Sequence, residues 1–112
     1  MKLITTIIRP DRLPEVKAAL FRGGVTGITL SRVVGHGGER DVVQQYRAET
    51  VVLEFHEKVR IEIAVSDEVV TKAVGAIVKS AKTGKIGDGK VFIVPLEEAI
   101  RIRTDERGDS AV

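Results

Sequence analysis

The chain has 112 residues, which fits one domain with a buried core. Charged residues make up 30% of it but nearly balance to a formal net charge of +2, and only three Phe and one Tyr are present, so nucleic-acid binding is not expected. Cysteine is absent, which excludes disulfides, thiolate metal sites and cysteine nucleophiles.

The N-terminal segment 2–9 carries β-branched and apolar residues on both alternating faces, which predicts a strand covered on both sides and ended by Pro10. Because Arg9 and Pro10 follow so soon, the segment lacks the apolar centre of a signal peptide. No apolar stretch of the sequence approaches the roughly 20 residues that span a bilayer. We therefore expect a soluble, cytoplasmic protein.

A short helix is predicted next, with Asp11 as its N-cap and Gly23 at its end. Its apolar face consists of Leu13, Val16 and Leu20. Segments 27–34, 51–55 and 59–65 are predicted strands, the last because its apolar residues alternate strictly.

Segment 35–49 interrupts this pattern, because it is rich in glycine and charged residues and has few apolar residues that could pack into a core. A polar excursion of this length is usually functional, and the alternative is an extended hairpin that ends in a mobile loop. His36 lies in this segment. A structural metal site there is not expected, because His56 is the only other histidine and no acids stand at ligand spacing.

A second helix follows Ser66 and Asp67, which form a good N-cap. Its apolar stripe consists of Val69, Val70, Ala73, Val74, Ile77, Val78 and Ala81. Segment 91–94 is a further strand, 100–103 is an extended segment, and 104–112 is expected to fray.

The order βαββαβ predicts an α+β, ferredoxin-like fold in which two helices cover one face of an antiparallel sheet. The first and last strands are apolar on both faces. We therefore expect oligomerisation to cover the second face of the sheet.

Segment 83–90, with the sequence TGKIGDGK, joins the second helix to the strand that follows. Its three glycines let backbone N–H groups turn toward one point and its lysines flank that point, which is the chemistry of a phosphate cradle. The alternative is a helix C-cap at Gly84 and a hairpin-type turn that begins at Asp88. Arg101 and Arg103 leave the same side of an extended segment and suit a polyphosphate, or they belong to a solvated edge strand.

Segments 83–92 and 100–104, the pair Tyr46-Arg47 and the opening Ile-Ile-Arg-Pro of 7–10 together resemble the PII nitrogen-regulatory signal transduction proteins. The resemblance runs from Met1 to Thr104. It implies a single PII domain over 1–112 that forms a homotrimer, binds ATP or ADP in the clefts between subunits, and is not an enzyme.

The resemblance also divides the chain into a long T-loop at about 36–55, a B-loop at about 82–90 and a C-terminal tail at about 104–112. It implies that the nucleotide is bound by residues from six parts of the chain. These are Ile7, Thr29, Gly35, His36, Gly37, Gly38, Glu62, Ala64, Gly87, Asp88, Gly89, Lys90, Arg101 and Arg103.

In this family ATP and a magnesium ion complete a 2-oxoglutarate site at the base of the T-loop. Lys58 matches the lysine that pairs with a carboxylate of that ligand, and Arg9 lies near it. Glu39 stands where the family usually has a glutamine that completes the magnesium shell. Its carboxylate suits magnesium but adds a negative charge beside a dianionic ligand.

Tyr46 and Arg47 match the T-loop tip, which implies docking on an ammonium transporter or an enzyme of nitrogen assimilation, so that the membrane is met only through the transporter. Val51 and Glu49 replace the tyrosine and the serine that are modified in relatives, so neither uridylylation nor phosphorylation is expected there.

Two alternatives stay open. One is a PII-like sensor of bicarbonate or of another adenine nucleotide, outside nitrogen metabolism. The other is a nucleotide phosphotransferase, which needs a nucleophile or base at the phosphates, although no Cys and no well-placed His is expected near 83–90.

Overall fold

The computed structural model describes residues 1–36, 41–45, 48–52 and 55–112. Within this part the elements are β1 (Lys2–Ile8), η1 (Pro10–Arg12), α1 (Leu13–Arg22), β2 (Thr29–Gly35), β3 (Asp41–Gln45), β4 (Ala48–Val52), β5 (His56–Val65), α2 (Asp67–Ala81), β6 (Lys90–Pro95) and η2 (Gly108–Ala111). The predicted βαββαβ order is confirmed, with the hairpin β3–β4 inserted between its second and third strands.

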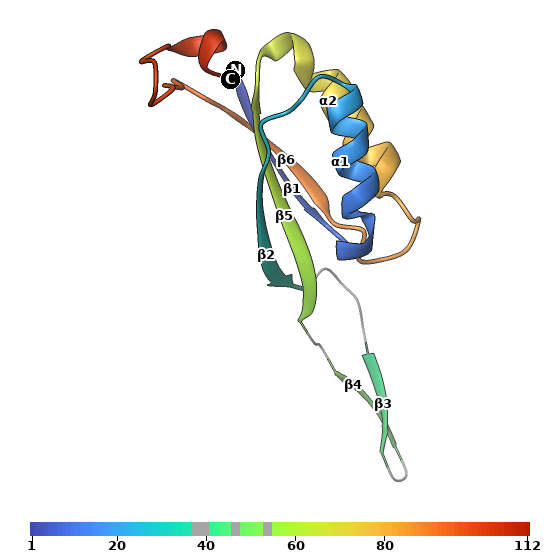
Figure 1. Cartoon of the computed structure of the whole chain (residues 1–112). Coiled ribbons are helices and arrows are strands. Elements are labelled where there is room, and N and C mark those ends of the chain that lie inside the picture. Colours follow the sequence, from blue (N-terminus) through green and yellow to red (C-terminus); the bar gives the residue numbers. More distant parts are fainter. Residues whose placement is uncertain (37–40, 46–47, 53–54) are drawn as a thin grey trace.

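Four strands form one antiparallel sheet in the order β2-β5-β1-β6, and α1 and α2 lie side by side on one face of it (Figure 1). This is the ferredoxin-like arrangement that the element order predicts. The pair β3–β4 is a separate two-stranded sheet, which Figure 1 shows beyond the end of β2 and β5. None of the helices in the described ranges combines the length and hydrophobicity needed to cross a bilayer.

The core lies between the sheet and the two helices. The strands contribute one alternating face, because every second side chain of a strand points to the same side. Each fully buried aliphatic side chain contributes about 1.5–3 kcal/mol. The core consists of Ile4, Ile8, Val16, Leu20, Val25, Val59, Ile61, Ile63, Val65, Ala73, Ile77 and Ala81.

The second face of β1 is only half-buried, so the prediction of a strand covered on both sides is wrong for the single chain. The reason is that both helices pack on the other face. Val78, predicted as part of the apolar stripe, is 44% exposed because α2 turns it away from the sheet. The face without helices carries several apolar side chains, among them Phe92 and Val94 of the edge strand β6.

The helix ends also differ from the prediction. Asp11 lies in η1 and the N-cap of α1 is Arg12, because the chain makes a short 3-10 turn before the helix begins. The C-cap of α2 is Lys82, two residues before the predicted Gly84. The predicted strand 51–55 is shorter at its end, since Phe55 belongs to no strand and is 72% exposed.

The C-terminal segment is folded, so the prediction of a frayed tail is wrong. The backbone turns back at Asp105, which has φ +60°, and the turn is closed by Asp105 N–H donating to Arg101 O (2.8 Å) and Arg101 N–H donating to Glu106 O (2.9 Å). A single bridge then pairs Ile100 with Arg107 before η2. Local backbone hydrogen bonds thus order a segment without a hydrophobic core.

Candidate functional site

The glycine loop, residues 82–90, runs from the end of α2 to β6 and lies directly against β1. Gly89 has φ +101°, and a Cβ atom at this position would lie 1.6 Å from the carbonyl oxygen of Ile7. Gly87 has φ +104°. Only glycine adopts such angles without strain and allows so close a backbone approach, so this part of the sequence is required by the path of the loop.

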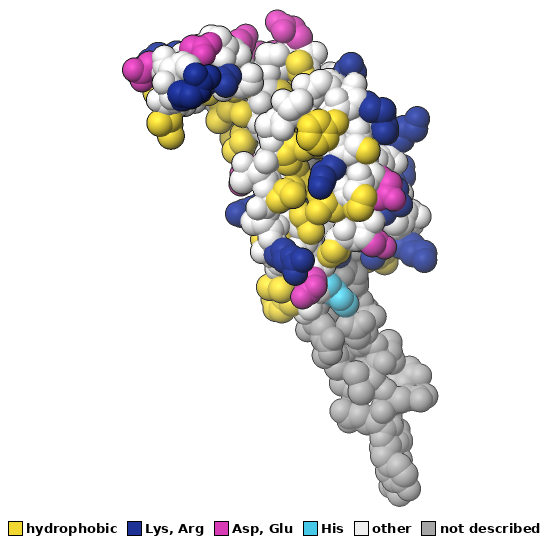
Figure 2. Space-filling view, in the orientation of Figure 1, with side chains coloured by type: hydrophobic (Ala, Val, Ile, Leu, Met, Phe, Trp, Pro, Cys, Tyr) yellow, Lys and Arg dark blue, Asp and Glu magenta, His cyan; other side chains and the backbone are white. Residues whose placement is uncertain are grey.

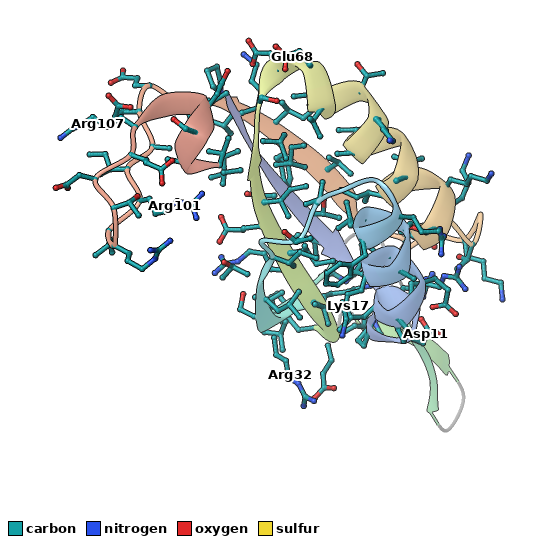
Figure 3. All side chains as sticks on the ribbon, turned by 45° about the horizontal axis from the view of Figure 1, so that its top comes forward. Asp11, Lys17, Arg32, Glu68, Arg101 and Arg107 are labelled. Atoms are coloured by element: carbon teal, nitrogen blue, oxygen red, sulfur yellow. The ribbon has the colours of Figure 1, made fainter. Side chains whose placement is uncertain are left out.

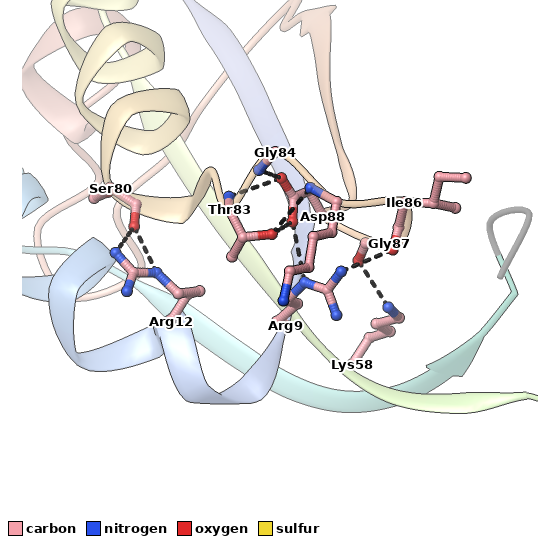
Figure 4. Close-up of polar contacts among 10 residues, drawn as sticks. Arg9, Arg12, Lys58, Ser80, Thr83, Gly84, Ile86, Gly87 and Asp88 are labelled. Atoms are coloured by element: carbon pink, nitrogen blue, oxygen red, sulfur yellow. Dashed lines mark hydrogen bonds and ion pairs between the residues drawn. The ribbon is translucent and has the colours of Figure 1, made fainter.

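Asp88 organises this loop from inside (Figure 4). Its Oδ2 accepts hydrogen bonds from the backbone N–H groups of Thr83 (2.8 Å) and Gly84 (2.9 Å). Its Oδ1 accepts from the Thr83 hydroxyl and from Arg9 Nε (3.0 Å). Four donors therefore converge on one carboxylate, which makes Asp88 a structural centre of the loop.

Two cations, Arg9 directly after β1 and Lys58 in β5, hold the other side of the loop through its carbonyl groups. An Arg9 terminal nitrogen donates to Ile86 O (2.7 Å), and Lys58 Nζ donates to Gly87 O (2.8 Å) (Figure 4). The Lys58 side chain is buried. Both residues were predicted beside a dicarboxylate ligand, and in the structure they bind the glycine loop.

A pocket of about 480 Å³ opens between the loop, β1, β5 and the end of β2. It brings together eight of the predicted nucleotide and 2-oxoglutarate residues: Ile7, Gly35, His36, Lys58, Gly87, Asp88, Gly89 and Lys90. It also contains Lys85, Ile86 and Phe92, which were not predicted as site residues. Lys85 and Ile86 belong to the glycine-rich segment, so the sequence could have indicated them as site residues. Phe92 reaches the pocket only because β6 pairs with β1.

A larger hollow of about 720 Å³ runs along the edge strand β2. It is lined mainly by aliphatic side chains and lacks a glycine loop with convergent N–H groups. The smaller pocket is therefore the better candidate for an anionic ligand, because three lysines line it and its one carboxylate, Asp88, already accepts four hydrogen bonds.

This chain is similar to known proteins over its full length. The family model described as "Nitrogen regulatory protein P-II" matches residues 1–106. The chain belongs to the PII family. A PII protein of Cereibacter sphaeroides is 48% identical and one of Nostoc punctiforme 46% identical, each over the full length of both chains. A solved structure, Arabidopsis thaliana PII bound to citrate, has a TM-score of 0.81 and 36% identity, and the match covers 99% of this chain and 91% of that one.

Not every predicted site residue of this PII chain lies in the pocket. Thr29 pairs with Glu62 across β2 and β5, and Ala64 lies two residues further along β5. Along β5, Ala64 is about 20 Å from Lys58 at 3.3 Å per residue. Glu62 accepts a hydrogen bond from the Thr5 hydroxyl (3.3 Å) instead.

Arg101 and Arg103 also lie away from the glycine loop, beyond the opposite end of β6; Figure 3 labels the first of them. The prediction that both leave one side of an extended segment is wrong, because the chain turns at 102–104. An Arg101 terminal nitrogen donates to Ser110 O (3.1 Å), and Arg101 Nε lies 3.7 Å from a Glu106 carboxylate oxygen. These contacts stabilise the C-terminal turn.

The remaining predicted site residues lie outside the described residues: Gly37, Gly38, Glu39, Tyr46 and Arg47. The backbone on both sides of the last two forms the antiparallel hairpin β3–β4. The two described strands have the form of the extended hairpin that is the structural alternative for this excursion.

The hydrogen bonds on Asp88 lead to a testable pH dependence. Those from Thr83, followed by those from Arg9 and Gly84, stabilise the carboxylate and hold the pKa of Asp88 well below its ordinary 3.8. A depressed pKa stabilises the folded loop above 3.8, and this contribution is lost as pH falls through the lower value. We expect the Asp88 carboxyl carbon, followed by NMR, to titrate below 3.8. A midpoint at or above that value would contradict the role of Asp88.

Proposed function

We propose that this PII chain is a signal transduction protein that binds ATP or ADP at the glycine loop and regulates nitrogen metabolism through its T-loop. The observation that carries this proposal is the pocket, in which Lys58, Lys85 and Lys90 surround a loop whose glycines have positive φ. Asp88, the one carboxylate among the lining residues, is already engaged by four donors. The remaining positive charge suits a polyphosphate.

Two features of the single chain support a homotrimer. The sheet face without helices carries apolar side chains, including Leu3, Ala64, Phe92 and Val94, which neighbour one another across β5, β1 and β6. In addition, the predicted nucleotide residues lie at two ends of the sheet. A cleft between subunits would join the glycine loop of one copy to Arg101 and Arg103 of the next, so that three subunits form three sites.

A carboxylate effector would act through the residues that hold the loop. The solved Arabidopsis relative is described as bound to citrate, a polycarboxylate. We propose that 2-oxoglutarate binds near Lys58 and Arg9, with magnesium supplied together with ATP and held by oxygen ligands that include Glu39. An effector carboxylate that accepts a hydrogen bond from Lys58 competes with the Gly87 carbonyl for the same donor. Effector binding and the conformation of the glycine loop would therefore be linked.

The T-loop would carry the signal to a target. Arg47 at its tip has a guanidinium with five donors, which suits insertion into the cytoplasmic mouth of an ammonium transporter or the surface of a nitrogen-assimilation enzyme. A nucleotide can shift this loop only through different affinities for its states, and a few kcal/mol suffices.

A phosphotransferase remains the second candidate because of one observation. His36, one of the predicted nucleotide residues, lines the same pocket as the glycine loop. An imidazole beside phosphates has the chemistry of a general base. Phosphate release from ATP at enzyme-like rates, abolished in His36→Gln, would favour this candidate; binding without turnover supports the regulatory function.

The direct test of the proposed function is Lys90→Ala. Loss of a charge-assisted phosphate contact should weaken ATP binding by about 1.5–3 kcal/mol in calorimetric titration, with the oligomer intact by light scattering. The control is Lys17→Ala, a lysine on α1 that does not line the pocket (Figure 3). Equal ATP affinity of both variants and the unmodified protein would remove the glycine loop as the nucleotide site.

A further inference from the structure

A second hollow, of about 520 Å³, lies between α1 and α2, away from the pocket of the glycine loop. Four cations line it: Arg12 and Arg22 at the two ends of α1, and Lys72 and Lys79 on α2. We call it the helix groove. Its lining includes a single carboxylate, Glu15, so its formal charge is +3, whereas the whole chain carries only +2.

This charge is not neutralised within the part of the chain that the structure describes. No salt bridge there joins Arg22, Lys72 or Lys79 to a carboxylate. Arg12 Nε and a terminal nitrogen donate to Ser80 O at 2.9 and 2.5 Å, but a carbonyl oxygen does not cancel a charge (Figure 4). Figure 2 shows Lys and Arg side chains gathered along the edge where α1 and α2 lie.

The uncharged residues that line the helix groove are all small, and among them Ala19 is buried and Gly23 and Ala76 are partly buried. Lys72 reaches across the groove, since its Cε lies 3.8 Å from the position that a Cβ atom on Gly23 would take. Small side chains between two helices let the backbone of a third segment approach closely, while cations at the rim select negative charge.

We propose that the helix groove binds an acidic segment of a partner protein, with Asp or Glu side chains on the rim cations and small apolar side chains against its small residues. Its lining contains no aromatic residue on which a base could stack and no large apolar residue that could insert into a membrane. The chemistry of the groove therefore favours a peptide over a nucleic acid or a lipid surface.

The groove lies on the helix side of the sheet, so it stays accessible if the opposite sheet face is covered by further copies of the chain. It shares no lining residue with the pocket of the glycine loop. A partner could therefore bind here independently of the nucleotide, and the inference does not depend on the proposed nucleotide site.

The test is a selection of displayed random 16-residue peptides on the full-length protein, followed by fluorescence anisotropy of the labelled, selected peptides. We expect enrichment of Asp and Glu, and about tenfold weaker binding to Lys79→Glu, in which attraction becomes repulsion. The matched control is Lys17→Glu, which makes the same change in net charge on α1 outside the groove and should leave affinity unchanged within about twofold. Lys79→Gln is the second variant, because it removes the positive charge without placing a glutamate near the end of α2, where a negative charge can destabilise the helix.

Three outcomes would overturn the proposal. The first is no enrichment of acidic peptides, and the second is equal loss of binding in the Lys79→Glu and Lys17→Glu variants, which would indicate a net-charge effect alone. The third is binding of phosphatidylserine vesicles or of an oligothymidine strand that depends on Lys79 while the selected peptides do not, which would assign the groove to a lipid surface or a nucleic acid.

Discussion

Gly89→Ala is expected to abolish measurable ATP binding and to lower the thermal stability of the protein. The alanine Cβ would lie 1.6 Å from the Ile7 carbonyl oxygen, and this oxygen belongs to the backbone of the central strand β1, which cannot yield as a flexible side chain can. The φ of +101° adds roughly 1–3 kcal/mol of strain for a non-glycine residue. The loop must therefore leave β1, and the pocket beside it opens.

The matched control is Gly84→Ala. Gly84 lies in the same loop at φ +86°, but a Cβ atom there meets nothing within 4 Å. This variant should show only backbone strain, about 1–2 kcal/mol, and should keep ATP binding. Calorimetric titration and thermal unfolding of both variants separate the two effects. If Gly89→Ala binds ATP as well as Gly84→Ala does, the close approach to β1 is not needed for the site.

Arg9→Gln should weaken ATP binding roughly tenfold or more, since hydrogen bonds to charged groups are the strong ones. Arg9 bonds both the Asp88 carboxylate and the Ile86 carbonyl, so a single residue ties two points of the glycine loop to the end of β1. A glutamine side chain is shorter and uncharged and cannot reproduce both contacts. The measurement is calorimetric titration with ATP, with circular dichroism to verify the fold.

Arg12→Gln is the control for this variant, because Arg12 is also an arginine bound to a backbone carbonyl, that of Ser80. It attaches η1 to the end of α2 and does not line the pocket of the glycine loop. Its loss should lower stability without changing ATP affinity. An equal drop in affinity for both variants would mean that Arg9 acts through general stability rather than by positioning the loop.

Local pattern was enough to predict most of the fold. The alternation in β5, the apolar stripe of α2 and the glycines of 83–90 each specify a conformation through neighbouring residues only, and the order of these elements leads to the ferredoxin-like arrangement. One error occurs where distant contacts decide, since Val78 is exposed because of how α2 sits on the sheet. Another has a local cause, since the C-terminal turn depends on a positive φ at Asp105, which is uncommon for a residue other than glycine.

The candidate site likewise has features that local sequence predicts and features that depend on distant contacts. Sequence alone determined that a glycine loop with flanking lysines follows the second helix, because glycine content and charge are local properties. Only the tertiary structure decided that Arg9 and Lys58 hold this loop, and that Arg9 binds the Asp88 carboxylate. It likewise brought Arg22 and Lys79 to one groove. The physical reason is that these partners are 29 to 79 residues apart along the chain, and hydrogen bonds and shared pockets over such separations arise from packing of the sheet and helices.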